Sequence, residues 1–454
     1  MNRRLFFALA LGACVAGCAA PARKEGFSDV QQLISARTGQ RIEWNQDQLE
    51  DQQAHDAVAG MLTAELTPQT SVQIALLNNR SLQATYEELG IAQAEVVQAG
   101  LLSNPIFGAS LRGSVNGGGP DVQLGVAQDF LDIFNRPLRK RMAKQEFEQA
   151  KLRVAQEVLK HASEVEIAFY ALQGNQQLAA MRKTMLDAAR ATHQLARQRF
   201  EAGNINELDF AIEEASYHAS ALAVSRADAE VRAGHQRLNR LLGLWGAEAN
   251  WKIADKLPAL PAEEQGIEEL EDVALGRRLD LKMARNQIAS AEQALRLTRR
   301  GIVNEVKVGA SYERDPGGSK VLGPTVELPL PLFDHGQGRM MKQQAQLRLA
   351  RRRKEALEVD VRADVHAARE KFVAADRTAR FYQESILPQQ KKILELSQQQ
   401  YNAMGLSVTS LLAAKTSAIA AETEYIEALQ DYWIARAELK AAVGGDSDAL
   451  EARP

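Results

Sequence analysis

The stretch from Asn104 to Leu131, NPIFGASLRGSVNGGGPDVQLGVAQDFL, decides the fold because it alternates like a β-hairpin. Apolar and polar residues alternate on both sides of a Gly/Pro loop at 116–120. The apolar positions are Phe107, Ala109, Leu111, Val115, Val122, Leu124, Val126 and Phe130. Strands of about ten residues around such a turn are typical of a transmembrane β-barrel, apolar towards lipid and polar towards a lumen. A hairpin with one face on a soluble core is the alternative.

The start of the chain carries an export signal and a lipidation motif. Positive residues at 3–4 precede an apolar run at 5–11, which is too short to span a membrane as a helix. Residues 1–17 are therefore predicted to be a signal peptide. Val15-Ala16-Gly17-Cys18 resembles the bacterial lipobox, in which the cysteine becomes the first mature residue. This resemblance implies diacylglyceryl and acyl chains, such as palmitate, on Cys18.

The residues around the motif predict the destination. Ala19 stands where, by the same resemblance, an Asp retains lipoproteins at the inner membrane, so the outer membrane is expected. A plain signal peptide cleaved near Ala20 is the alternative. Cys14 and Cys18 are the only cysteines, and Cys14 would leave with the signal. No disulfide and no cysteine-ligated zinc site is therefore expected in the mature chain.

The composition indicates long helices. The 454 residues are rich in Ala, Gln, Leu, Glu and Arg and contain few prolines and aromatics. The formal net charge of −3 is nearly neutral for this length and gives no support to nucleic-acid binding. We expect a mainly α-helical chain that carries membrane β-strands.

A predicted leader and a first helix precede the hairpin. Residues 18–68 have weak periodicity and are expected to form a partly extended, lipidated N-terminal leader. Thr67-Pro68 has the pattern of an N-cap followed by the first residue of a helix. The helical pattern then continues to about Gly100 and leads into the hairpin at about 104–131.

A long helical hairpin is predicted after the strands. A turn at 132–137 is followed by a helical pattern that continues to about Phe200, with Gly174 as its one weak point. A turn at 202–204 and a helix over 206–242 complete the hairpin. Apolar residues spaced 4, 4, 3, 4 and 3 apart form a coiled-coil seam. The seam consists of Val154, Val158, Ala162, Val165, Phe169 and Leu172.

The chain then repeats itself. Residues 243–268 read as a linker or equatorial segment, 269–443 as a second copy of 69–242, and 444–454 as a polar tail. The offset is roughly 200 residues. The matching pairs include Gly108-Ala-Ser110 with Gly309-Ala-Ser311, Phe200 with Tyr401, and Gly203 with Gly405. The second seam has the same spacing and consists of Leu357, Val361, Val365, Ala368, Phe372 and Ala375.

The second hairpin, at about 304–330, also alternates around a turn at 315–318. Charged residues Glu305, Lys307 and Glu327 share one face, which suits a wet lumen. Proline cannot donate to a strand ladder, so a bend or bulge is expected near the prolines of the return strand. These prolines are Pro324 and Pro329.

Four strands cannot close a barrel. An open edge in lipid would leave unpaired backbone groups at several kcal/mol each. A homotrimer would supply twelve strands, an even number wide enough for a channel. The helices of three copies would then pack side by side into a hollow cylinder.

The chain resembles the TolC family of outer-membrane efflux factors, in its lipoprotein branch, over about 69–443. The resemblance is carried by Asn104-Pro105, Pro331-Leu-Phe-Asp334 with Gly338-Arg339, Arg199-Phe-Glu-Ala-Gly203 and Gln400-Tyr-Asn-Ala-Met-Gly405. Asp132-Ile-Phe-Asn135 departs from the family's Pro-Leu-Phe-Asp at the first repeat. The resemblance implies a trimer with a twelve-stranded β-barrel in the outer membrane and an α-helical tunnel in the periplasm.

The same resemblance implies an outer-membrane exit duct of a tripartite efflux or export system, conducting substrates passively from periplasm to outside. Its partners would be a periplasmic adaptor (membrane fusion protein), an inner-membrane pump with the RND type as candidate, and outer-membrane lipids. Drugs, metal ions and secreted proteins all remain open as substrates. A lipidated adaptor is the first alternative, but it would need β-rich lipoyl-like domains. A coiled-coil structural lipoprotein is the second.

The two helical turns are candidate functional sites. Helices of this length would place the turns around Gly203 and Gly405 at the far periplasmic tip, where an entrance opens and an adaptor docks. Glycine also suits a left-handed turn between helices, so a purely structural role is the alternative. By resemblance, the entrance and adaptor candidates are Gly203, Asn204, Asn206, Asp209, Gly405, Ser407 and Thr409.

Two basic clusters are candidates for the barrel–tunnel junction. They are expected to contact anionic headgroups on the periplasmic side, with plain solvated charge as the alternative. Positive charge at a helix start opposes the helix dipole, so a compensating group is also expected. The clusters consist of Arg136, Arg139, Lys140 and Arg141, and of Arg296, Arg299 and Arg300.

No catalytic set is found, and no enzyme activity, cofactor or metal is expected. Glu214 and His218 stand four apart on a helix but lack an evident third ligand, so a solvated face is preferred. Met340, Met341 and Met404 are read as packing residues. Gly336-Gln-Gly338 lacks the rest of a dinucleotide fingerprint and is read as a turn.

Overall fold

A computed structural model of the chain describes residues 24, 26–46, 49–113, 120–129, 131–261, 270–300, 306–315, 317–327 and 332–445. The chain divides into two units, which we name by their main content. The sheet unit comprises Met1–Val30, Tyr86–Lys151 and Arg285–Arg351. The helical unit comprises Gln31–Thr85, Leu152–Ala284 and Arg352–Pro454.

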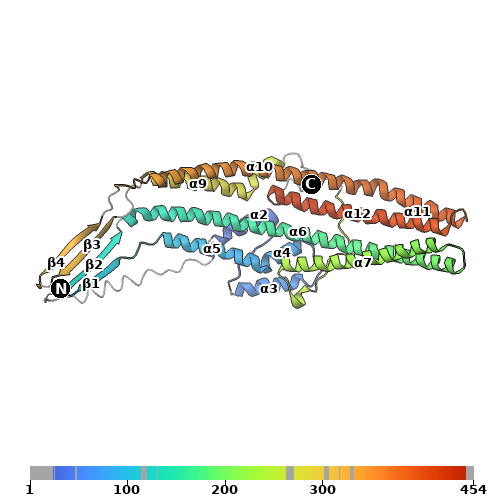
Figure 1. The fold of residues 1–454 in the computed structure, drawn as a ribbon, viewed down its shortest axis with the longest axis horizontal. Helices are drawn as coiled ribbons and strands as arrows, with labels where there is room; N and C mark the ends of the chain where they lie inside the picture. Colours follow the sequence, from blue (N-terminus) through green and yellow to red (C-terminus); the bar gives the residue numbers. More distant parts are fainter. Residues whose placement is uncertain are drawn as a thin grey trace. The chain divides into compact units, whose positions relative to one another are not determined.

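The sheet unit contains both predicted hairpins in one sheet (Figure 1). Its strands are β1 (Ile106–Arg112), β2 (Asp121–Asp129), β3 (Lys307–Arg314) and β4 (Lys320–Glu327). They are antiparallel in the order β1-β2-β3-β4, so β2 and β3 join the hairpins of the two repeats. Strands β1 and β4 are left as the edges of the sheet.

The two faces of the sheet differ as the alternation predicts. Val126 stands opposite Phe107 on one side and Ala310 on the other, so apolar residues of different strands share a face. The other face is polar and small, with Gln123 opposite Ser110 and Glu313. The apolar face consists of Phe107, Ala109, Leu111, Val122, Leu124, Val126, Val308, Ala310, Tyr312, Leu322, Pro324 and Val326, with Gln128, Arg314 and Lys320 at its margins.

The bulge expected near Pro324 is absent. Pro324 lies opposite Ala310 within an uninterrupted register from Lys307–Glu327 to Arg314–Lys320. Strand β4 is an edge of this four-stranded sheet, and edge strands are where proline is tolerated. Pro329 lies outside the described residues.

The turn predicted at 132–137 is wrong. Helix α6 (Leu131–Glu201) begins before it and includes Pro137. The Asp132 carboxylate accepts hydrogen bonds from the backbone N–H and hydroxyl of Ser103, at 2.8 and 3.0 Å. An acidic residue in the first turn of a helix is also stabilised by the helix dipole. A single proline then removes only one of the intrahelical bonds of a 71-residue helix.

The leader contains two helices that the sequence pattern did not predict, and residues 39–46 lie outside them. Helices α2 (Phe27–Thr38) and α3 (Leu49–Met61) lie between the start of the described chain and Thr67. Phe27, Val30 and Ile34 are almost fully buried at a helical spacing of three and four residues. The pattern is short and was therefore missed among the polar runs around it.

The first predicted helix begins as expected but is interrupted. Thr67 caps α4 (Pro68–Asn78) by accepting a hydrogen bond from the Thr70 N–H, and Pro68 is the first helical residue. The chain breaks at Asn79 and resumes as α5 (Arg80–Ala99). The Asn79 amide nitrogen donates to the carbonyls of Arg240 and Leu241. Its Oδ1 accepts from the N–H groups of Ser81 and Leu82 and caps α5, so a distant and a local contact both hold the break.

Two helical hairpins make up most of the helical unit (Figure 1). In the first repeat, α6 is followed by α7 (Glu207–Leu242) and a 3-10 turn (Gly246–Ala249). In the second, α8 (Leu270–Arg277) and α9 (Leu279–Arg300) precede the strands. The second hairpin consists of α10 (Gln337–Phe381), a π-turn (Tyr382–Ile386), α11 (Leu387–Asn402) and α12 (Val408–Val443).

The predicted seams lie in the core. Every residue of the first seam is buried, from Val154 to Leu172. In the second, Val361, Val365 and Phe372 are buried, and the remaining members pack partly buried against the same cluster. Gly174 does not interrupt α6, which runs unbroken through it, and a Cβ there would lie 2.5 Å from the Gln430 side chain. Among the described residues, no helix is long and apolar enough to cross a membrane.

Candidate functional site

The turn between α6 and α7 is a left-handed helix end. Gly203 has a φ of 71°, and its N–H donates to the Phe200 carbonyl at 2.9 Å. The Asn204 N–H reaches back to the Arg199 carbonyl at 2.7 Å. Such a pair of bonds satisfies carbonyls that would otherwise be free at a helix end. The Asn206 side chain then begins α7 by accepting from the Asp209 N–H at 2.8 Å.

The turn between α11 and α12 has the same bonds, shifted by one residue from the predicted match. Met404, and not Gly405, has the left-handed conformation, with a φ of 61°. Its N–H donates to the Tyr401 carbonyl at 2.9 Å, and the Gly405 N–H donates to the Gln400 carbonyl at 2.8 Å. Gly203 therefore corresponds to Met404. The expectation that Gly405 supplies the left-handed residue is wrong.

Ser407 completes this turn in the way Asn206 completes the first. Its hydroxyl accepts from the Ser410 N–H at 3.1 Å and caps α12. The structure brings the predicted residues of each turn together at the junction of two helices. All of them are exposed, namely Gly203, Asn204, Asn206, Asp209, Gly405, Ser407 and Thr409. Met404 joins this set as a residue that the sequence reasoning assigned to packing, although 95% of its surface is exposed.

An aromatic stack lies behind the first turn and was not predicted. Phe200 and Phe210 stack with ring centroids 5.1 Å apart and an interplanar angle of 9°. His193 stacks on Phe210 at 5.5 Å and on Tyr217 at 5.3 Å. The signal was the seven-residue spacing of the rings on each helix, which places them on one face. This stack ties α6 to α7 next to the turn.

The basic cluster at the start of α6 is partly structural. Arg136 donates through its Nε to the Gly100 carbonyl at 2.5 Å, and Arg139 donates to the Leu101 carbonyl at 3.3 Å. Arg139 also forms an ion pair with Asp132. The Arg139 guanidinium, together with the N–H and hydroxyl of Ser103, holds the pKa of Asp132 well below its usual range. Asp132 is thus the expected compensating group.

The remaining described members of the two basic clusters have no partner of this kind. Lys140, Arg141, Arg296 and Arg299 are exposed on α6 and α9. None of them forms an ion pair or side-chain hydrogen bond within the described part of the chain. The side chain of Arg300 lies outside the described residues. The basic residues therefore fall into two groups. Arg136 and Arg139 bind the backbone at the end of α5, whereas Lys140, Arg141, Arg296 and Arg299 are exposed cations without a partner in the described part of the chain.

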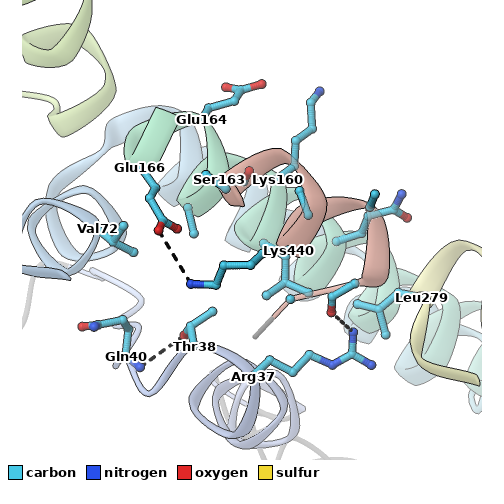
Figure 2. Close-up of a pocket in the computed structure, with 18 of the residues that line it drawn as sticks. Arg37, Thr38, Gln40, Val72, Lys160, Ser163, Glu164, Glu166, Leu279 and Lys440 are labelled. Carbon is cyan, nitrogen blue, oxygen red and sulfur yellow. Dashed lines mark hydrogen bonds and ion pairs between the residues drawn. The ribbon is translucent and has the colours of Figure 1, made fainter. Parts of the chain in front are cut away.

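The helical unit contains a cavity of about 420 Å³ (Figure 2). Residues of α2, α4, α6, α9 and α12 line it. Lys440 and Glu166 form an ion pair across it at 3.6 Å. Arg37 donates to the carbonyls of Gly444 at 2.8 Å and Arg277 at 2.7 Å, and so joins the ends of α8 and α12. Burial, and then the charge of Arg277, lower the pKa of Arg37.

Other predicted features have a simple outcome. Cys18 lies outside the described residues. Glu214 and His218 have no third ligand, because no group of three His, Cys, Asp or Glu in the described part of the chain is placed to hold a metal ion. The cavity was not predicted, because its central contacts join residues 240 and 407 positions apart.

The chain belongs to the outer membrane efflux protein family, whose model matches residues 71–244 and 270–445. These two matches cover both repeats. No curated protein sequence matches the chain. Proteins of this family are outer-membrane channels, and the chain is the exit duct of a tripartite efflux system.

Solved structures of outer-membrane channels have the same fold. The CmeC channel of Campylobacter jejuni is 14% identical, with 83% of this chain and 85% of CmeC covered at a TM-score of 0.69. VceC of Vibrio cholerae is 15% identical, with coverages of 83% and 96% and a TM-score of 0.67. The open-state MtrE channel of Neisseria gonorrhoeae is 18% identical, with coverages of 83% and 89% and a TM-score of 0.61.

These findings confirm the predicted family and architecture. The chain has the fold of the trimeric channels that combine a β-barrel with an α-helical tunnel. The family comprises channels and not enzymes. A lipidated adaptor and a coiled-coil structural lipoprotein, the two alternatives, are therefore set aside.

Proposed function

We propose that the chain works as a lipid-anchored homotrimer that conducts substrates passively through the outer membrane. The observation that carries this proposal is the open sheet. β1 and β4 are unpaired edges, and the face between them is apolar and exposed, with 74% of Leu111 and 76% of Leu322 accessible. Unpaired edges in lipid cost several kcal/mol for each backbone group. Three copies of four strands close a twelve-stranded barrel in which β1 of one copy pairs with β4 of the next.

The oligomeric state is tested with the detergent-extracted protein. We expect light scattering to give three times the monomer mass, unboiled electrophoresis to give a heat-labile trimer, and planar bilayers to show channel conductance. A monomer that stays soluble without detergent would contradict the proposal. Mass spectrometry of the N-terminus tests the anchor, because we expect lipid mass on Cys18 that is absent from Cys18→Ser.

The two exposed helix turns serve as the periplasmic entrance and the contact for a periplasmic adaptor. Support comes from their shared geometry and exposure, because an adaptor that meets both turns would find the same backbone bonds at Gly203 and Met404. The partner in the inner membrane is a pump, with the RND type as the first to test. This assignment extends the family's role in tripartite systems to particular residues.

The turn variants must separate contact from folding. Asn206 and Ser407 cap helices, and Gly203 is left-handed, so changes at these residues would destabilise the hairpins directly. The informative variants are Asn204→Trp, Asp209→Lys and Thr409→Trp, at exposed residues. We expect loss of efflux and of adaptor crosslinking with normal trimer levels. Glu230→Lys, at an exposed residue of α7 far from the turn in sequence, is the matched control. Efflux that persists in all three variants would contradict the assignment.

The exposed cations of the sheet unit contact anionic headgroups on the periplasmic side of the membrane. Support comes from the absence of protein partners for Lys140, Arg141, Arg296 and Arg299 in the described chain. Juxtamembrane cations each contribute about 1 kcal/mol of attraction to an anionic surface. Changing these residues to Gln is expected to lower trimer insertion into anionic vesicles but not into neutral ones. Equal insertion into both would contradict this role. Arg136 and Arg139 are left unchanged because they hold the end of α5.

A further inference from the structure

Two cations stand directly opposite each other on neighbouring strands of the sheet. Arg314 ends β3, Lys320 begins β4, and the register pairs them. Both residues are exposed, and neither side chain has a hydrogen-bond or ion-pair partner among the described residues. Directly opposite side chains have Cβ atoms about 5 Å apart, where like charges destabilise a sheet. The pair therefore calls for a compensating anion from outside the chain.

The pair lies on the apolar face of the sheet. Arg314 also stands opposite Val122, and the preceding row on the same face consists of Leu124, Tyr312 and Leu322. The face is thus apolar along the strands, has a tyrosine one row before its end, and ends in two cations. Tyrosine and long cationic side chains are typical of the boundary between hydrocarbon and headgroups.

The pair is at the turn end of the hairpins. Every strand joins a helix at its other end, because β1 follows α5, β2 leads into α6, β3 follows α9 and β4 leads towards α10. If the helices are periplasmic, as the proposed function requires, the turn end faces outwards. The cations then meet the outer leaflet.

On the opposite face of the same sheet end, the register places unlike charges across from each other. Arg112 and Asp121 are paired in register there, so a cation on that face stands across from an anion. At this end of the sheet, the like-charge pair therefore lies on the apolar face, whereas the register on the other face pairs a cation with an anion. A phosphate monoester supplies up to two negative charges and several acceptor oxygens, and it fits between a guanidinium that donates two bonds and an ammonium.

We propose that Arg314 and Lys320 form a binding site for the phosphate group of an outer-leaflet lipid headgroup. The site rests on the proposed function, because it needs the apolar face to meet lipid. Each trimer would carry three such sites on its outer circumference. The lipid would bind between the strands of the second hairpin and remove the repulsion between the two cations.

Lipid binding is measured on the full-length trimer in detergent by native mass spectrometry. The probes are a phosphorylated lipid A and the same lipid with its phosphates removed. We expect the wild type to prefer the phosphorylated lipid. At about 1 kcal/mol per cation, Arg314→Gln and Lys320→Gln are each expected to weaken binding about fivefold, and the double variant about 25-fold. Arg112→Gln removes the same charge at the same sheet end from the other face, and we expect it to change binding by less than about twofold.

Three outcomes would overturn the proposal. These are equal binding of both lipids, an equal loss of binding in Arg112→Gln, and binding of inorganic phosphate alone as tight as that of the lipid. Lys320→Glu provides a second readout, because it places opposite charges across the strands. We expect this variant to lose lipid binding but to raise the melting temperature in lipid-free detergent.

Channel conductance separates this proposal from the proposed function. If every variant conducts in neutral bilayers and the changes at Arg314 and Lys320 leave lipid affinity unaltered, only the lipid site is wrong. If the wild type neither forms trimers nor conducts, the barrel and the lipid site are both wrong. Conducting wild-type protein with the predicted order of lipid affinities supports both.

Discussion

Met404 takes the left-handed backbone conformation in the second helical turn that Gly203 takes in the first. Their φ angles are 61° and 71°, and the flanking hydrogen bonds correspond one for one. A residue with a Cβ is strained in this conformation, whereas glycine is not. The two repeats thus use one turn geometry with different residues. The less favourable residue is also 95% exposed, so it gains little from packing where it stands.

Met404→Gly is therefore expected to stabilise the protein by about 1 kcal/mol per subunit, because the left-handed strain is removed. Gly203→Ala is expected to destabilise it by about the same amount. Denaturant unfolding at fixed protein concentration measures both changes. Gly405→Ala is the control, because its φ is not positive and the added Cβ would meet the nearest atom at 3.6 Å. A destabilised Met404→Gly would show that Met404 is held by contacts beyond its own subunit.

Gly309 is expected to be essential for the sheet. A Cβ at this position would lie 2.3 Å from the Val126 carbonyl oxygen and 3.0 Å from the Ala127 Cα, both of which are backbone atoms that cannot turn aside. Gly309→Ala is expected to cost about 3 kcal/mol and to lower trimer yield, by analogy with overpacked cores. Gly125→Ala is the matched control on a central strand, because its nearest contact would be 3.8 Å away. Heat-labile trimer on unboiled gels is the readout, and equal yields from the two variants would contradict the prediction.

Asp132 is expected to make stability depend on acid pH. Its pKa is lowered in the folded state, first by Arg139 and then by Ser103, so the unfolded chain binds a proton that the folded chain does not. The contribution of Asp132 is therefore complete above its unfolded pKa of about 4 and is lost as the pH falls below it. Melting temperatures between pH 7 and pH 3 are expected to fall less steeply in Asp132→Asn, from a lower starting value. Parallel curves for the two proteins would contradict this.

Two histidines of the helical unit are expected to make the stability of the protein depend on pH near pH 6. Burial lowers the pKa of His161, although its hydrogen bond to the Leu241 carbonyl at 2.9 Å opposes the change. Burial also lowers the pKa of His235, which stacks on Trp251 with centroids 4.1 Å apart. The unfolded chain binds protons more readily at both positions, so stability decreases as the pH falls below about 6.5.

The double variant His161→Gln, His235→Gln tests this prediction. We expect the wild type to lose melting temperature between pH 7 and pH 5.5 and the double variant to lose less. His218→Gln is the control, because it makes the same substitution at an exposed histidine of α7. An unchanged slope in the double variant would contradict the assignment.

The hairpins, the repeat and the seams were predictable from the sequence because each depends on a local period. Alternating apolar and polar residues predict the two faces of β1 to β4. Apolar residues three and four apart predict the buried seam from Val154 to Leu172. The sequence also predicted the cap at Thr67, whose partner lies three residues away. Features of this kind need no knowledge of distant parts of the chain.

The missed features depend on distant partners or on small changes of register. The break at Asn79 is held in part by carbonyls 161 and 162 residues away. The left-handed residue of the second turn is Met404, one position before the Gly405 that the repeat alignment matched to Gly203. The bonds that divide the basic cluster connect Arg136 and Arg139 to residues 36 and 38 positions earlier. Pattern reasoning identified these residues but not their different roles.

Arg37 sets the order in which the helical unit can become complete. Its guanidinium contacts carbonyls 240 and 407 residues further along the chain, and it has to be buried for both contacts to form. Loops of that length close late and slowly during folding. The hydrogen bonds of Arg37 are therefore completed only once the chain has been made as far as Gly444, so the helical unit cannot reach its final form from the first repeat alone.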